Sequence, residues 1–173
     1  MAVRRALAYP SCAASAATLW CSWTDGSDAA THIYVASSSD GGVTWSAPTR
    51  LGVSAASDQF NQWLAVDPAD GSIDVAYYDT AGDPARLTTL YTLSRSTDDG
   101  ASWSTSAVAN ARTDETSSAA NLGNQYGDYE GLAALNGVVR PVWTDRRQAV
   151  ADLGLREEVF TAAIATTTTP HRR

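Results

Sequence analysis

The chain has 173 residues, 44% of them hydrophobic and 18% charged, which suits one domain with a proper core and excludes a disordered chain. Its 19 acidic and 12 basic residues give a formal net charge of −7, so nothing supplies the positive patch that a general nucleic-acid binder needs. All 12 basic residues are arginines, which excludes a Schiff-base lysine.

The first seventeen residues only faintly imitate a signal peptide. Tyr9, Pro10, Ser11 and Ser15 interrupt the apolar stretch, so we interpret it as the start of the first strand and expect an export segment to lie upstream. No apolar run reaches eighteen residues, so no transmembrane helix is predicted.

The rest of the chain is predicted to form short strands in three units. The first unit has strands near 7–14, 18–25, 31–37 and 44–51; the second has them near 61–67, 72–79, 88–95 and 102–108; the third has them near 129–135, 138–144 and 156–164. Turn signals separate strands at Asp70-Gly71, Asp99-Gly100 and Asn136-Gly137. No segment has useful helical periodicity.

Two motifs repeat along these units. The pattern Ser-x-Asp-x-Gly-x-Thr/Ser-Trp occurs twice, as Ser38, Asp40, Gly42, Thr44 and Trp45 and again as Ser96, Asp98, Gly100, Ser102 and Trp103. An aromatic residue also stands two positions before an aspartate three times, in Trp23-Thr-Asp25, Tyr77-Tyr-Asp79 and Trp143-Thr-Asp145. Four-stranded antiparallel units at this spacing predict an all-β partial β-propeller of about three blades. An immunoglobulin-like sandwich would not repeat a motif at this interval.

The eight-residue pattern is interpreted as a folding device. Its aspartate accepts hydrogen bonds from backbone N–H groups of the turn, and its glycine supplies a positive φ. Each tryptophan ring, Trp45 and Trp103, is expected to pack between neighbouring sheets.

Other chemistry is poorly supported. The histidines are His32, inside a strand-like run, and His171, in a tail at 166–173, so we predict no metal site and no cofactor. Cys12 and Cys21 flank a predicted hairpin, where either a disulfide or two buried thiols would fit.

The eight-residue pattern resembles the Asp-box, or bacterial neuraminidase repeat, of the sialidase superfamily. The segments 58–67, 127–131 and 141–147 resemble bacterial exo-α-sialidase-like proteins. The resemblance covers residues 6 to 165 and implies a six-bladed propeller, of which blades at about 5–52, 58–109 and 127–165 form the C-terminal part. We therefore expect a fragment, with the missing blades supplied by the rest of the protein or by another chain.

The resemblance also implies an active site at the end of the blades opposite the Asp-boxes. Sialidases use a tyrosine nucleophile polarised by a glutamate, an aspartate acid/base, and arginines that bind the substrate carboxylate. The catalytic candidates here are Tyr126, Tyr129, Glu130 and Asp128. The candidates for substrate binding are Arg146, Arg147, Asp145 and Asp79.

Structural alternatives exist for each candidate. Asp79 and Asp145 fit the role of turn caps at strand ends, and of the two arginines one would be solvated and one paired with a carboxylate. Strand alternation places Tyr129 and Glu130 on opposite faces, so Tyr126 pairs with Glu130 more easily.

The leading hypothesis is an extracellular or cell-surface sialidase-like glycoside hydrolase acting on terminal sialic acids of glycans. The alternatives are a non-catalytic Asp-box propeller that binds glycans or proteins, and an inactive fragment.

Overall fold

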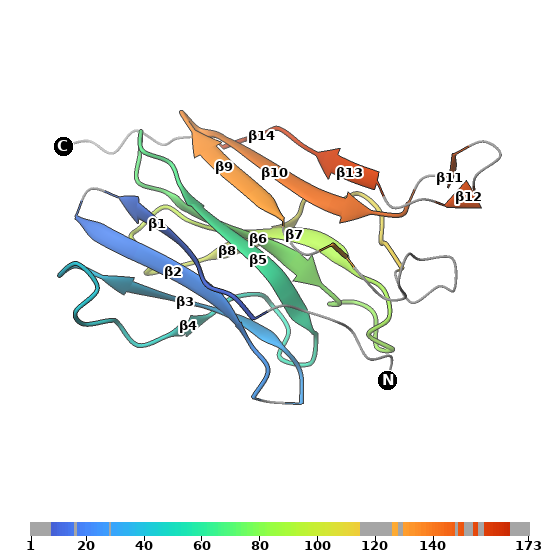
Figure 1. Ribbon diagram of the computed structural model, residues 1–173, viewed down its shortest axis with the longest axis horizontal. Coiled ribbons are helices and arrows are strands. Elements are labelled where there is room, and N and C mark those ends of the chain that lie inside the picture. The colour runs from blue at the N-terminus through green and yellow to red at the C-terminus, as the bar shows by residue number, and fades with distance from the viewer. Residues whose placement is uncertain are drawn as a thin grey trace.

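The computed structural model describes residues 8–15, 17–27, 29–114, 126–127, 130–147, 149–150, 154–155 and 158–166. All regular structure in this described part is β-strand (Figure 1). The strands are β1 (Ser11–Ser15), β2 (Thr18–Asp25), β3 (His32–Ser38), β4 (Thr49–Arg50), β5 (Gln59–Val66), β6 (Ile73–Asp79), β7 (Leu90–Ser96), β8 (Ser104–Ala107), β9 (Gly131–Leu135), β10 (Val138–Asp145), β11 (Ala149–Val150), β12 (Gly154–Leu155), β13 (Glu158–Thr161) and β14 (Ile164–Ala165).

The strands form three four-stranded antiparallel sheets, as the sequence predicts. Sheet 1 has the order β1-β2-β3-β4, and sheet 2 has the order β5-β6-β7-β8. In sheet 3, the central strand β10 pairs with β9 on one side and with β13 and β14 on the other. The strands β11 and β12 form a separate two-stranded hairpin. The all-β fold class and the partial propeller arrangement are therefore confirmed.

The strand boundaries depart from prediction mainly in the fourth strands. Strand β4 is two residues long and starts at Thr49, because the amide of Thr44 is bound by the Asp40 carboxylate. In sheet 3, the single strand predicted at 156–164 is divided into β13 and β14.

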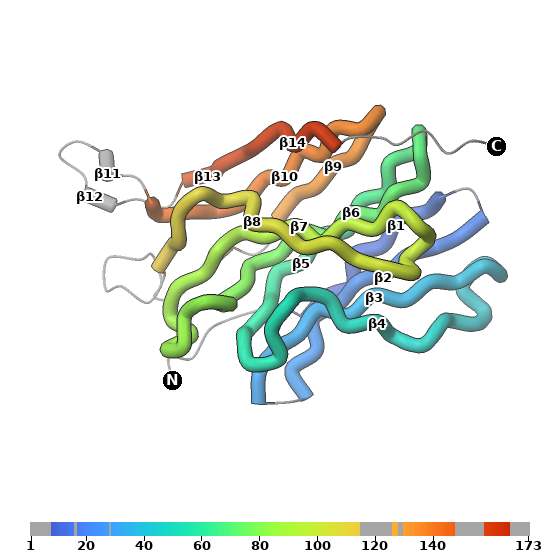
Figure 2. The backbone as a smooth tube through the Cα atoms, turned by 180° about the vertical axis from the view of Figure 1, so that it is seen from behind, coloured from blue at the N-terminus to red at the C-terminus, as the bar shows by residue number. Residues whose placement is uncertain are grey.

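Sheet 2 lies between the other two sheets in both ribbon and tube views (Figures 1 and 2). Its first strand, β5, contacts β1 and β2 of sheet 1 and β9 of sheet 3. The first strands of successive sheets therefore lie next to one another, which is how blades are arranged around a propeller axis.

Alternation along β6 explains how sheet 2 covers two neighbours. Ile73, Val75 and Tyr77 face sheet 1, while Ala76 and Tyr78 face sheet 3. Since both faces are covered, every residue of β6 is buried. The core between sheets 1 and 2 consists of Trp20, Ile33, Val35, Leu51, Leu64, Ile73, Val75 and Tyr77. The core between sheets 2 and 3 consists of Phe60, Ala76, Tyr78, Tyr91, Leu93, Ala109, Tyr126, Val139 and Trp143.

Polar side chains also connect the sheets. Gln59 on β5 accepts a hydrogen bond from the amide of Ile33 in sheet 1 at 3.1 Å and donates one to Asp79 in its own sheet at 3.0 Å. The buried Asp67 accepts hydrogen bonds from the amides of Asn136 and Gly137, in the turn between β9 and β10 of sheet 3, at 3.1 and 2.7 Å. These contacts fix sheet 2 to both neighbours.

Cys12 and Cys21 form a disulfide. The two residues are directly opposite each other in the β1–β2 ladder, with their Cα atoms 4.1 Å apart. Of the two states that the sequence permits, the structure has the bonded one.

Candidate functional site

The two hairpins that carry the repeated eight-residue pattern, residues 38–45 and 96–103, are called the box hairpins below. In the first, Asp40 accepts hydrogen bonds from the amide and the hydroxyl of Thr44, at 2.9 and 2.6 Å. In the second, Asp98 accepts the same two bonds from Ser102, at 2.9 and 2.5 Å. One bonding scheme therefore closes both hairpins.

The serine that begins each pattern completes the scheme. Ser38 donates a hydrogen bond to Asp40 and accepts one from the amide of Gly42, and Ser96 does the same with Asp98 and Gly100. The hydrogen bonds from Thr44 and Ser38 lower the pKa of Asp40 to about 2, and those from Ser102 and Ser96 lower the pKa of Asp98. The serine, aspartate and threonine side chains of the first pattern, and the serine and aspartate side chains of the second, are thus used inside their own hairpins.

The two tryptophans differ in their surroundings. Trp103 packs against the core between sheets 1 and 2, as expected. Trp45 is 45% exposed, with its indole N–H donating to the carbonyl of Gly42. The expectation that Trp45 also packs between sheets is wrong for the described part of the chain, because no described sheet lies against that side of sheet 1.

At the opposite end of the sheets, three aspartates end the second strands. Asp25, Asp79 and Asp145 each accept a hydrogen bond from the backbone amide two residues later, at 2.7, 2.7 and 2.9 Å. This is the Asx-turn geometry, in which the carboxylate replaces a backbone acceptor. The repeated aromatic-x-Asp motif therefore marks the same strand-ending turn three times.

The guanidinium of Arg147 is fixed by polar and aromatic side chains of the same chain. Its guanidinium bonds the Asp145 carboxylate and the side chain of Asn110. The guanidinium carbon also lies 4.9 Å from the ring centroid of Phe160 and 5.9 Å from that of Trp143. A substrate carboxylate at Arg147 would have to compete with Asp145, which is itself buried and also accepts from Trp143.

Arg146 is buried, so it is not the solvated arginine that the surface interpretation of this pair requires. Its backbone amide donates to Thr113 at 3.0 Å, and its guanidinium donates to the backbone carbonyl of Asp114, also at 3.0 Å. Arg146 therefore braces the segment that follows sheet 2.

Glu130 lies immediately before β9, with only 6% of its surface exposed. Its Oε1 is 3.0 Å from the hydroxyl oxygen of Tyr78 on the neighbouring sheet. Burial raises the pKa of Glu130 to about 9, and burial beside Glu130 raises the pKa of Tyr78 well above its usual value. Both groups are therefore neutral at pH 7.

The number of available protons determines which groups donate in the hydrogen bonds around Tyr78 and Glu130. The Tyr78 hydroxyl has one hydrogen but two acceptors nearby, Glu130 and the carbonyl of Thr144 at 2.7 Å. A protonated Glu130 donates to the Tyr78 oxygen, which leaves the Tyr78 hydrogen for Thr144. The amide of Thr144 donates back to the Tyr78 oxygen at 2.9 Å.

Tyr126 is fully buried beside this pair. Its ring centroid is 4.6 Å from that of Tyr78 and 5.1 Å from that of Phe60, and its hydroxyl accepts a hydrogen bond from Thr89 at 3.2 Å. The other two predicted catalytic residues, Asp128 and Tyr129, lie outside the described residues. Sequence reasoning missed Tyr78. Its signal was the alternation that sends Tyr77 and Tyr78 to opposite sheets.

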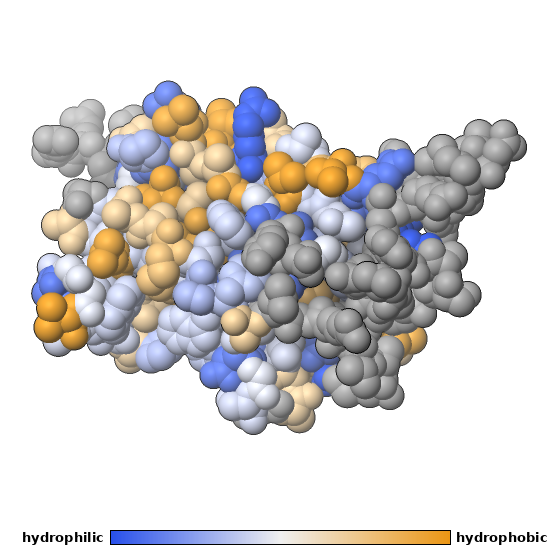
Figure 3. Space-filling view, in the orientation of Figure 1, coloured by the Kyte–Doolittle hydropathy of each residue, from blue (hydrophilic) through white to orange (hydrophobic). Residues whose placement is uncertain are grey.

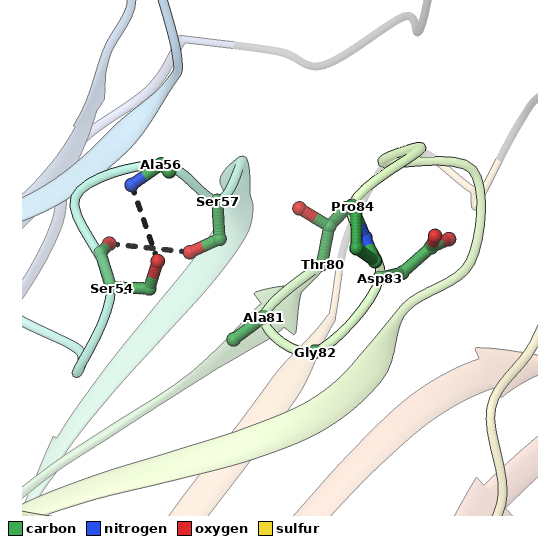
Figure 4. A pocket seen from close by; sticks show the side chains of 8 residues that line it. All are labelled: Ser54, Ala56, Ser57, Thr80, Ala81, Gly82, Asp83 and Pro84. Atoms are coloured by element: carbon green, nitrogen blue, oxygen red, sulfur yellow. Dashed lines mark hydrogen bonds between the residues drawn. The ribbon is translucent and has the colours of Figure 1, made fainter.

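A shallow pocket of about 280 Å³ opens beside the turn that follows β6 (Figure 4). Its lining consists of Ser54, Ala56, Ser57, Thr80, Ala81, Gly82, Asp83 and Pro84. Asp83 binds the amides of Leu87 and Thr88 and the Thr88 hydroxyl, and hydrogen bonds, chiefly those from Thr88, lower its pKa to about 2. The pocket thus contains none of the predicted catalytic residues.

Within the described residues, no group of three or more His, Cys, Asp or Glu side chains is arranged to hold a metal ion. The described part of the chain also has no helix long and apolar enough to span a membrane.

No family model matches the chain, and no curated protein matches it. Among solved structures, the chain is similar to a GH43 endo-arabinanase from Bacillus licheniformis, with 12% sequence identity and a TM-score of 0.31, over 89% of this chain and 72% of that chain. A TM-score of this size carries no argument about what this chain does.

Proposed function

We propose that this chain is part of an extracellular, sialidase-like propeller that hydrolyses terminal sialic acids of glycans. The observation that carries the proposal is the contact between Tyr78 and Glu130 across sheets 2 and 3. The resemblance of the box hairpins to Asp-boxes implies a tyrosine nucleophile polarised by a glutamate, and Tyr78 and Glu130 are such a pair in hydrogen-bond contact among the described residues.

The chemistry of this pair would follow from its charges. A neutral tyrosine is a better nucleophile than a carboxylate at an anomeric centre that already carries a carboxylate, because it approaches without repulsion. Glu130 would have to be ionised to accept the Tyr78 proton. Since burial raises the pKa of Glu130 to about 9, turnover by this pair would increase as the pH rises toward 9.

A second candidate is a non-catalytic propeller module that binds glycans or proteins. Two observations favour it: Tyr78 and Glu130 are buried in the core between the sheets, and the Arg147 guanidinium is occupied by Asp145. In this case the Tyr78–Glu130 contact stabilises the interface between sheets 2 and 3.

The direct test is release of 4-methylumbelliferone from its sialic acid conjugate by the wild-type chain and by the Tyr78→Phe variant. Tyr77→Phe is the matched control, because Tyr77 is equally buried and its hydroxyl also makes one side-chain hydrogen bond, to Ser94 at 2.7 Å. Hydrolysis lost only in Tyr78→Phe supports the enzyme. Absence of turnover in the wild type at every pH up to 9 removes the hydrolase from this chain.

Calorimetric titration with free sialic acid separates the second candidate from an inert chain. Binding without turnover, weakened by Arg147→Ala, supports a glycan-binding module. Affinity that is the same in Arg147→Ala and in the wild type would exclude Arg147 as a carboxylate ligand.

A further inference from the structure

Sheets 1 and 3 each have one face that no described sheet covers. The first outer face carries Trp23 and Tyr34, which lie opposite each other on β2 and β3, and the exposed Trp45 of the first box hairpin. The third outer face carries the exposed residues Arg140, Val142 and Val159 of β10 and β13. Figure 3 shows apolar surface over the sheet of β9, β10 and β13, where Val142 is 40% and Val159 is 76% exposed.

The first outer face repeats an aromatic pair that is covered elsewhere in the molecule. Trp23 pairs with Tyr34 across β2 and β3 as Trp143 pairs with Phe160 across β10 and β13, and the ring centroids are 6.1 and 6.0 Å apart, both stacked. Trp143 is buried because it stacks on Tyr91 of sheet 2, with centroids 5.1 Å apart and planes at 10°. Trp23 has the same geometry without a described sheet to stack on.

The third outer face contains the position equivalent to Tyr91, the residue on which the aromatic pair of the neighbouring sheet stacks. Tyr91 is paired with Tyr78, the residue before the strand-ending aspartate of sheet 2, and Val159 is paired with the corresponding Thr144 of sheet 3. Tyr91 is buried beneath Trp143, whereas Val159 is exposed. Val159 is therefore the sheet 3 equivalent of the residue on which an aromatic pair stacks.

The box hairpins independently indicate that the first outer face matches the third outer face. Gly100 lies so close to Trp20 of sheet 1 that a Cβ there would stand 2.6 Å from the Trp20 ring, while Gly42 meets nothing closer than 3.8 Å. Trp20 precedes Trp23 by three residues, and Arg140 precedes Trp143 by three residues. Arg140 therefore occupies in sheet 3 the place that Trp20 has in sheet 1, and it is exposed. The hairpin that contains Gly42 would cover Arg140, and the Trp45 ring would stack on its guanidinium.

We propose that a second copy of this chain docks head to tail, so that the first outer face of one copy covers the third outer face of the other. The first outer face thus carries the aromatic pair and the box hairpin that would cover Val159 and Arg140 on the third outer face. The contacts are those already made between adjacent sheets inside one chain. Head-to-tail interfaces form rings when the rotation closes, and two copies close a ring of six sheets, within the range of four to eight for propellers.

The test is the mass of the full chain in solution, by light scattering coupled to size-exclusion chromatography. We expect twice the chain mass of 18.2 kDa, and one chain mass for Val159→Asp. Val53→Asp is the matched control, because Val53 is 79% exposed in the loop after β4, outside both outer faces, and its variant should remain a dimer. Circular dichroism checks that each variant stays folded.

A mixing experiment tests the head-to-tail arrangement. Trp45→Asp alone should also be monomeric, but mixed with Val159→Asp it should form a dimer, because each variant keeps the face that the other lacks. A monomeric wild type would overturn the proposal. Dimers that resist Val159→Asp, or variants that fail to recombine, would also overturn it.

Discussion

Replacing Glu130 by glutamine should remove a pH dependence from the stability of this protein. The side chain keeps its size and its contact with Tyr78, but it can no longer ionise. In the wild type, the pKa of Glu130 is about 9 when folded, against 4.5 for the ordinary glutamate. Between these values the folded state holds a proton that the unfolded state has released, so the free energy of unfolding falls as the pH rises.

The magnitude follows from proton linkage. One proton bound only in the folded state changes the free energy of unfolding by about 1.4 kcal/mol per pH unit. From pH 6.5 to 8.5, the wild type should therefore lose about 2.7 kcal/mol more than Glu130→Gln. The stabilising contribution is complete below about pH 4.5 and is lost by about pH 9. Asp74, whose pKa burial raises to about 6, is present in both proteins, so its titration cancels in the difference between them.

The assay is urea unfolding followed by tryptophan fluorescence, for both proteins at several pH values from 6.5 to 8.5. The difference between the two free energies of unfolding should fall steadily with pH. Parallel curves would refute the reasoning, because they would mean that Glu130 is ionised in the folded protein.

Two further changes test the packing and the crosslink. Gly100→Ala should destabilise the chain by about 3 kcal/mol, because its φ of +79° disfavours a side chain and the new Cβ would overlap the Trp20 ring. Its control is Gly41→Ala, at φ +73° with nothing within 4 Å, which should lower the free energy of unfolding by only about 1 kcal/mol in the same urea titration. Equal losses in the two variants would show that the contact with Trp20 is unimportant. The double change of Cys12 and Cys21 to serine should lower the free energy of unfolding by about 2.5 to 3 kcal/mol, the entropy of opening a loop with a sequence separation of 9; a loss below about 0.5 kcal/mol would show that the β1–β2 ladder alone holds the hairpin.

The sequence predicted the sheets well because their determinants are local. The turn at Asn136-Gly137 has both residues at positive φ, as a two-residue hairpin requires. The Ser-x-Asp-x-Gly pattern forms its hydrogen bonds within five residues. Such features need no knowledge of the rest of the fold.

The contacts between sheets were harder to predict. Tyr78 and Glu130 are 52 residues apart, and their contact depends on which faces of sheets 2 and 3 meet. The burial of Arg146 depends on Thr113 and Asp114, and no motif or spacing in the sequence places these residues near Arg146. Exposure of Trp45 likewise depends on what covers sheet 1 rather than on the hairpin itself.

The polar contacts that join sheet 2 to its neighbours bear on how the chain loses its structure. In repeat proteins, single units often unfold separately, because each unit contacts only its nearest neighbours and through similar surfaces. Here Gln59 joins an amide of sheet 1 to a carboxylate of sheet 2, and Asp67 holds the β9–β10 turn of sheet 3. If either outer sheet unfolded alone, the Gln59 or the Asp67 side chain would lose its hydrogen-bond partners in that sheet. We therefore expect the three sheets to unfold together in one cooperative transition.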